Sequence, residues 1–93
     1  MPELRVTRRA TNDLRQLPTT VQEAVLETLD RIAVDPEAAG KELVGRLQGL
    51  WSARVGNYRV LYTVEPTGVI VRAIRHRAFL NRGRQRGLTD VSV

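Results

Sequence analysis

Apolar side chains recur at helical spacing over residues 8–17 and 19–34. In each segment they line one side of the helix, while most of the other positions are polar. The two stripes consist of Ala10, Leu14 and Leu17 in the first segment, and of Val21, Val25, Leu29 and Ile32 in the second. Because the join between the segments is short, the pattern predicts an antiparallel helical hairpin whose stripes face one core.

The ends of these helices carry signals of their own. Thr7 is a favourable N-cap for the first helix. Thr20 and Glu23 have the spacing of a capping box at the start of the second helix. Asp35 precedes a proline, and such a residue is disfavoured in the helical region, so the second helix is expected to end there.

After residue 50, apolar and polar residues alternate in two runs, 51–55 and 58–64, as in strands with one buried face. The pair Gly56-Asn57 between them suits a tight two-residue turn, which fixes how the two strands pair. One face of the hairpin then carries Trp51, Ala53, Tyr58, Val60, Tyr62 and Val64. This face is expected to lie on the core.

The opposite face of the hairpin places Arg54 directly opposite Arg59. Like charges in opposed cross-strand positions destabilise a sheet. The arginine side chain also offers a planar fork of donors that fits a phosphate group. The pair therefore predicts an anion site on the face of the sheet that points away from the core.

Two more strands are expected, at residues 3–6 and 69–75. If Val64 pairs with Val69, the core face of the last strand carries Val69, Val71 and Ala73, and the arginine face gains Ile74 and His76. A slip of one residue reverses these faces and buries Arg72, so the first register is preferred.

Residues 36–49 are expected to form a connection anchored by Leu43 and Leu47. The element order is then β-α-α-β-β-β. It predicts an α+β domain, in which the helical hairpin packs on one face of a mostly antiparallel four-stranded sheet.

The chain has 93 residues and no cysteine, which excludes disulfides and thiol chemistry. Its length suits one domain, expected to span residues 1–87, with a flexible tail at 88–93. No stretch has the character of a signal peptide or a membrane span. A cytoplasmic protein without a membrane partner is expected.

The net charge of +5 is unevenly distributed. Residues 1–42 contain six Lys and Arg against eight Asp and Glu. Residues 43–93 contain nine arginines against two acids, and hence a charge of +7. A basic half of this kind predicts a polyanionic partner, with nucleic acid the first candidate.

The run Leu-Trp-Ser-Ala-Arg-Val-Gly-Asn-Tyr-Arg-Val-Leu-Tyr at 50–62, followed by Ile-Arg-His-Arg at 74–77, resembles the RelE/ParE superfamily of bacterial toxins. The likeness covers nearly the whole chain and is greater to the RelE branch than to the gyrase-directed ParE branch. It implies a ribosome-dependent endoribonuclease that cuts mRNA without a metal or another cofactor. It also implies a cognate antitoxin.

The resemblance assigns roles to individual residues. Arg59 matches the arginine that contacts the scissile phosphate, and Arg54 matches the second of two basic positions on the preceding strand. Arg77 matches the arginine after the last strand, and His76 stands beside it. These four residues are the expected catalytic set.

Cleavage by the RNA's own 2′-hydroxyl needs cations around the phosphate and groups that accept and donate a proton. The arginines supply the cations, and His76 is of the residue type that titrates near neutral pH. Contacts to the RNA backbone are expected from Arg54, Arg75, Arg82, Arg84 and Arg86. A two-metal site is not expected, because Glu65 is the one carboxylate near the sheet in the basic half.

Two residues depart from the family pattern. Ser52 stands at the first basic position of its strand, and Asn81 stands near the usual tyrosine. Asparagine can neither stack on a base nor act as a phenolic acid. Two alternatives therefore stay open: a ParE-like inhibitor that binds DNA gyrase, and a weakened toxin that binds RNA or antitoxin without cutting.

The expected partners are the ribosome, mRNA and the antitoxin. A basic half of charge +7 favours an antitoxin whose acidic C-terminal segment is disordered when free. Such a segment folds over the basic surface on binding, and the opposite charges speed its capture.

Overall fold

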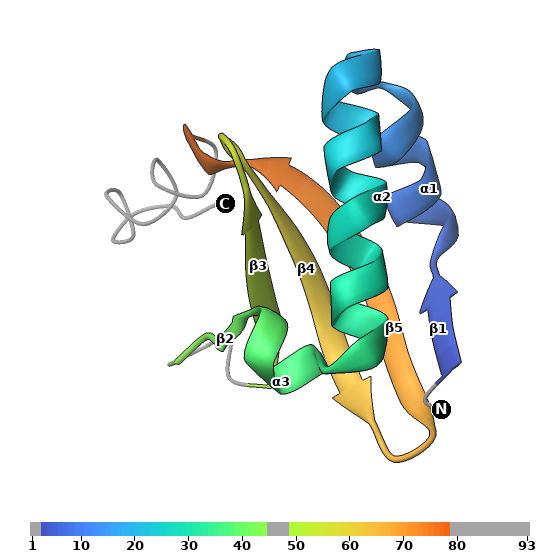
Figure 1. Ribbon diagram of the computed structural model, residues 1–93, viewed down its shortest axis with the longest axis vertical. Coiled ribbons are helices and arrows are strands. Elements are labelled where there is room, and N and C mark those ends of the chain that lie inside the picture. The colour runs from blue at the N-terminus through green and yellow to red at the C-terminus, as the bar shows by residue number, and fades with distance from the viewer. Residues whose placement is uncertain (1–2, 45–48, 79–93) are drawn as a thin grey trace.

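The computed structural model describes residues 3–44 and 49–78, which form two layers, with the helices on one face of a sheet (Figure 1). The elements in chain order are β1 (Glu3–Val6), α1 (Arg8–Arg15), α2 (Thr19–Val34), α3 (Pro36–Ala39), β2 (Lys41–Glu42), β3 (Trp51–Val55), β4 (Tyr58–Glu65) and β5 (Gly68–His76). The expected α+β class is confirmed. None of the helices in these ranges is long and apolar enough to cross a membrane.

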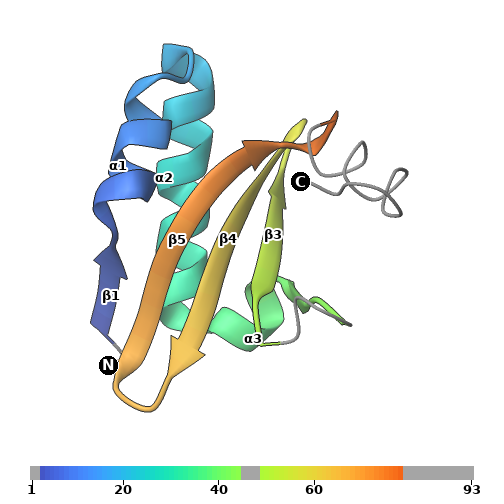
Figure 2. The ribbon, with the colours of Figure 1, turned by 180° about the vertical axis from the view of Figure 1, so that it is seen from behind.

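The sheet has five strands in the order β1-β5-β4-β3-β2. β1 runs parallel to β5, and the other neighbours are antiparallel. The expected count of four strands was wrong, because the short strand β2 lies in the segment expected to be a connection. A two-residue strand is too short to leave an alternating pattern in the sequence. Seen from behind, the sheet face opposite to α1, α2 and α3 is in view (Figure 2).

The expected starts of α1 and α2 are both confirmed, but the expected capping box of α2 is not formed. The Thr7 Oγ1 accepts a hydrogen bond from the Ala10 N–H at 3.1 Å. α2 begins after Pro18, whose side chain makes no capping bond. The helix therefore starts two residues earlier than a capping box with Thr20 as the N-cap requires, and the Gln22 side chain instead donates to the Leu17 carbonyl at 3.0 Å.

The core lies between the helices and the sheet. Its buried residues are Ala10, Val25, Leu29, Ile32, Ala53, Val55, Val60, Tyr62, Val69, Val71 and Ile74. Leu14, Leu17 and Val21 pack against this cluster, so both predicted stripes are confirmed. The predicted core face of the hairpin is confirmed as well, with Trp51 stacked on Tyr62 at a ring-centroid distance of 6.3 Å.

A β-bulge divides the register of β5 into two parts. Val64 pairs with Val69 as predicted, and Tyr62 pairs with Val71. The next pair is Leu61 with Ala73, so Arg72 is an extra residue on its strand.

Beyond the bulge the faces of β5 are exchanged. Ile74 pairs with Val60 and joins the core, whereas Ala73 and Arg75 lie on the arginine face. The predicted faces of Ala73, Ile74 and His76 were therefore wrong. Arg72 itself stays out of the core, and its Nε donates to the Thr63 Oγ1 at 3.2 Å.

The connection after α2 is partly ordered by the sheet. Leu43 is half-buried, and its N–H donates to the Leu50 carbonyl at 2.8 Å, which continues the pairing of β2 with β3. The other expected anchor, Leu47, lies outside the described residues, as do the expected domain boundary at residue 87 and the tail.

Candidate functional site

Three arginines from three strands stand side by side on the face of the sheet away from the helices. Arg54 of β3 is paired in register with Arg59 of β4, and Arg59 is paired with Arg75 of β5. We call these three residues the arginine row. The first pair was predicted from the sequence, and the second exists because the bulge at Arg72 turns Arg75 to this face.

The turn that sets the first pair is the predicted one. Gly56 has a φ of 58°, and no residue other than glycine has a positive φ among those described. A two-residue turn with a left-handed first position and an ordinary second position is of type II′, which matches the twist of a hairpin. Glycine at position 56 therefore fixes Val55 opposite Tyr58 and, one pair further, Arg54 opposite Arg59.

The members of the arginine row differ in their partners. The Arg75 Nη1 lies 3.3 Å from the Asp13 Oδ2 of α1, in a pair whose side chains are 21% and 18% exposed. Arg54 is exposed, and its Nε donates to the Gly56 carbonyl at 3.4 Å. Arg59 is half-buried, and within residues 3–44 and 49–78 its side chain has no hydrogen bond or ion pair. Arg54 and Arg59 thus keep a positive charge that no described carboxylate neutralises.

Asp13 also secures the strand that carries Arg75. Its Oδ2 accepts a hydrogen bond from the Ile74 N–H at 3.0 Å. The pairing of β1 with β5 ends at Val6 and Val71. The backbone N–H groups of β5 beyond this point therefore need an acceptor other than β1. Asp13 provides it from the helix.

His76 ends β5 on the side of the sheet that faces the helices. It is paired with Tyr58, and the two rings meet edge to face with centroids 5.0 Å apart. The His76 Nδ1 accepts a hydrogen bond from the Ala78 N–H at 3.0 Å. An accepting Nδ1 leaves the proton of a neutral imidazole on Nε2. In this arrangement neither ring nitrogen is a free proton acceptor.

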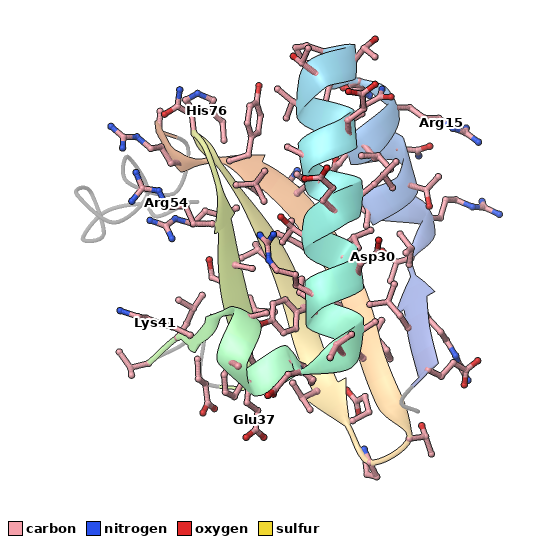
Figure 3. The ribbon with its side chains drawn as sticks, in the orientation of Figure 1. Arg15, Asp30, Glu37, Lys41, Arg54 and His76 are labelled. Atoms are coloured by element: carbon pink, nitrogen blue, oxygen red, sulfur yellow. The ribbon has the colours of Figure 1, made fainter. Side chains whose placement is uncertain are left out.

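Arg77 is exposed and directly follows β5. Its N–H donates to the Asn57 carbonyl at 2.7 Å, which ties this residue to the turn of the hairpin. His76 and Arg54 lie near the same end of the sheet (Figure 3). The four expected catalytic residues are therefore gathered at one end, although on different sides of the sheet. Asn81, Arg82, Arg84 and Arg86 lie outside the described residues.

One cation on this face was missed in the sequence. Lys41 of β2 is paired with Ser52 of β3, and directly opposed residues share a face of the sheet. Ser52 lies two residues before Arg54, so Lys41 is on the arginine face as well. No signal in the sequence predicted it, because β2 itself was not predicted.

Among the described residues, no three His, Cys, Asp or Glu side chains gather as ligands for a metal ion. The carboxylates nearest to the arginine face are engaged, since Asp13 holds Arg75 and Glu65 lies 3.9 Å from Arg72. What the face offers a ligand is positive charge and guanidinium donors. A phosphate group has the matching charge and acceptors.

Comparisons with known proteins show the family of this chain. Residues 4–80 match the family of the ParE toxin of the type II toxin–antitoxin system parDE. Toxin RelG of Mycobacterium tuberculosis is 38% identical over 82 residues, which is 85% of this chain and 94% of RelG.

Solved structures lead to the same group. The toxin–antitoxin complex RelBE2 of Mycobacterium tuberculosis contains a chain that is 36% identical, with a TM-score of 0.76 and coverage of 83% of this chain and 100% of that one. The archaeal RelE–RelB complex of Pyrococcus horikoshii contains a chain that is 25% identical, with a TM-score of 0.65. The match covers 82% of this chain and 94% of that one. The family match carries the ParE name, whereas these relatives carry RelE-type names. The chain belongs to the RelE/ParE family and is a toxin of the type II toxin–antitoxin class.

Proposed function

We propose that this toxin is an endoribonuclease that cleaves mRNA on the ribosome and so inhibits translation. The observation that carries the proposal is the opposed pair Arg54 and Arg59, which has no carboxylate partner among the described residues. The pair lies on the sheet face that points away from the core, and this face is turned toward the viewer in Figure 2.

The geometry of this pair suits a phosphate group. Val55 and Tyr58 flank a two-residue turn, so the next pair, Arg54 and Arg59, is of the closely approaching kind without mutual backbone hydrogen bonds. Their Cβ atoms are then about 4.5–5.5 Å apart. Two guanidinium groups at this spacing repel each other until an anion lies between them. A bound phosphodiester relieves the repulsion and accepts hydrogen bonds from both groups.

The proposed reaction needs no nucleophile from the protein. The RNA 2′-oxygen attacks the adjacent phosphorus, the bond from phosphorus to the 5′-oxygen breaks, and a 2′,3′-cyclic phosphate and a 5′-hydroxyl form. The proton lost by the 2′-hydroxyl is balanced by the proton gained by the leaving 5′-oxygen. Arg54 and Arg59 stabilise the charge that grows on the phosphate oxygens, which is where fixed cations accelerate a reaction most.

Arg77 and His76 have supporting roles in this proposal. Arg77 is tied to the hairpin turn and adds a cation at the end of the arginine row. The sequence indicated His76 for proton transfer, but the proposal gives it a minor part, because its Nδ1 is engaged by Ala78 and its ring lies on the side of Tyr58. The cations are therefore assigned the larger part of the rate enhancement. Neither a metal nor another cofactor takes part in the proposed reaction.

The proposed partners follow from the same surface. The ribosome presents single-stranded mRNA and excludes most other RNA conformations. An antitoxin is expected, since the relatives of solved structure are toxin–antitoxin complexes. We expect an acidic segment that folds on this toxin and covers the arginine row, because coupled folding lets a short segment cover a large surface. The cytoplasm is where these partners meet.

The family match to ParE favours one alternative, a toxin that binds DNA gyrase without cutting nucleic acid. The two departures from the family pattern, Ser52 and Asn81, favour another, a toxin that binds RNA or antitoxin without cutting. These alternatives and the proposed function predict different states of mRNA and gyrase in cells that express the toxin alone.

The test is to induce the toxin in cells and to map mRNA ends by primer extension, with Arg59→Gln as the inactive control. The proposed function predicts new 5′ ends inside reading frames with the native toxin and none with the variant. Intact messages together with trapped gyrase–DNA complexes would support the gyrase alternative. Intact messages without such complexes would support a toxin that only binds.

A further inference from the structure

We propose that Lys41 is a further RNA-binding residue, which contacts a phosphate next to the one held by Arg54 and Arg59. This inference rests on the proposed function and extends its site by one strand. The pairing of β2 with β3 places Lys41 on the same face as Arg54.

The register places Lys41 at a useful distance from the arginine row. Lys41 is directly opposite Ser52, and Ser52 is followed two residues later by Arg54 on the same face. Lys41 and Arg54 are thus diagonal neighbours, whose Cα atoms are about 7–8 Å apart. The flexible side chain of a lysine can cover the remaining distance to a neighbouring phosphate.

The charge of Lys41 is available to a ligand. Its side chain is exposed, and in the part of the chain that the structure describes it has no carboxylate partner. The adjacent Glu42 alternates to the other face, and its Oε2 accepts a hydrogen bond from the Gly49 N–H at 3.2 Å. In Figure 3, Lys41 and Arg54 both extend away from the helices at the β3 side of the sheet.

The backbone before Lys41 is held in place by close packing. A Cβ atom at Gly40 would meet the Tyr62 hydroxyl and the Ser52 carbonyl, so only glycine lets the chain lie flush on β3 at this point. The Tyr62 hydroxyl also donates to the Pro36 carbonyl at 2.7 Å, which fixes the start of the same segment. The position of Lys41 is therefore set by the core and does not depend on the two hydrogen-bonded residues of β2 alone.

Ser52 leaves room for a single cation at this pair. Its Oγ is buried and has no hydrogen-bond partner among the described residues. A basic residue at 52 would stand directly opposite Lys41 and repel it. We infer that, in the pair of Lys41 and Ser52, the positive charge lies on Lys41 of β2 and not on the residue of β3.

The experiment measures how the purified toxin binds a short single-stranded RNA in which 2′-O-methyl groups prevent cleavage. The dissociation constant is measured at several salt concentrations for the native toxin, Lys41→Gln and Arg15→Gln. Arg15 is the matched control, because it is exposed on α1 and projects from the other side of the molecule (Figure 3). Loss of one phosphate contact lowers the slope of log K against log salt by about 0.7 for a single strand. We expect this loss for Lys41→Gln and an unchanged slope for Arg15→Gln.

A second pair of variants tests the position of the charge. Lys41→Ser removes the cation, and adding Ser52→Lys returns it to the opposed residue on the same face. We expect the double variant to recover the native slope. An unchanged slope in Lys41→Gln would overturn the inference, as would equal loss in Lys41→Gln and Arg15→Gln.

Arg59→Gln separates this inference from the proposed function. If Arg59→Gln weakens RNA binding and Lys41→Gln does not, the inference alone fails. If neither variant changes RNA binding, both the inference about Lys41 and the proposed function fail.

Discussion

The Asp13 carboxylate and the Arg75 guanidinium lie 3.3 Å apart and join α1 to the arginine row. The same carboxylate oxygen accepts the Ile74 N–H at 3.0 Å, so one helical side chain serves both the backbone and the side chain of β5. Arg75 stands opposite Arg59, and the paired Asp13 reduces the repulsion between these two cations.

This relationship predicts a graded loss of stability at position 13. Asp13→Ala leaves the Ile74 N–H without its acceptor and removes the ion pair to Arg75, which is expected to cost about 1–3 kcal/mol of unfolding free energy. Asp13→Asn keeps an oxygen that accepts the N–H and is expected to cost less. Urea denaturation of both variants measures the difference. If Asp13→Ala has the same unfolding free energy as the native toxin, the hydrogen bond to Ile74 does not contribute to stability.

Arg59→Gln is expected to remove most of the activity and none of the stability. The variant takes away one cation that faces the reacting phosphate, and loss of one such group costs roughly 10²–10³ in rate by analogy with an oxyanion-hole donor. It also relieves repulsion from Arg54 and Arg75. The measurements are the cleavage rate on ribosomes and the thermal midpoint of unfolding.

The control for this variant is Arg72→Gln. Arg72 lies on the same face at the bulge, but it is paired with Thr63 and Glu65. Its replacement is expected to leave the cleavage rate nearly unchanged. Equal losses in Arg59→Gln and Arg72→Gln would mean that the total charge of the face matters and the arginine row does not.

His76→Gln is expected to reduce the rate far less than Arg59→Gln does. The Nδ1 of His76 is engaged by the Ala78 N–H, and the ring packs against Tyr58. The pH dependence of the cleavage rate is expected to keep its shape in His76→Gln. A loss as large as that of Arg59→Gln, together with disappearance of an inflection near neutral pH, would instead establish His76 as the acid–base residue.

The buried Tyr62 is expected to make the unfolding free energy depend on pH in the alkaline range. Burial raises the pKa of Tyr62 above its ordinary value of 10.0. The folded state therefore holds the phenolic proton at a pH where the unfolded chain has lost it. This stabilising contribution is complete below about pH 10 and is lost as the pH rises through the pKa of the folded state.

The measurement is the unfolding free energy of the native toxin and of Tyr62→Phe at increasing alkaline pH. The native toxin is expected to lose stability more steeply than the variant. At neutral pH the variant is expected to be less stable by about 0.5–1.5 kcal/mol, because it lacks the hydrogen bond to the Pro36 carbonyl. Parallel curves would show that Tyr62 does not titrate differently in the two states.

The features of the fold that depend on repeated patterns were predictable from the sequence. The spacing of Ala10 and Leu14, and the corresponding stripe of α2, gave the helical layer. The Gly56-Asn57 turn gave the register that places Arg54 opposite Arg59. These predictions succeeded because helix and hairpin geometry are set by neighbours in sequence.

The features that were missed depend on contacts between distant segments. The bulge at Arg72 has no glycine or proline to mark it, so the faces of Ala73, Ile74 and His76 were assigned wrongly. β2 exists because Gly40 can lie against Tyr62 and Ser52, which no local pattern indicates. The expected capping box of α2 is not formed, because the helix begins two residues earlier, after Pro18, without a side-chain cap.

In the proposed function, this toxin uses the arginine row to cleave mRNA through the RNA's own 2′-hydroxyl. The most direct test of this function is a reconstituted translation system with purified toxin and two messages, one native and one with a single 2′-deoxy nucleotide at the cut position. The native toxin is predicted to cut the first message only when ribosomes are present, leaving a 2′,3′-cyclic phosphate, and to leave the second intact. Cleavage of the 2′-deoxy message at an equal rate, or no cleavage of either message, would contradict the account.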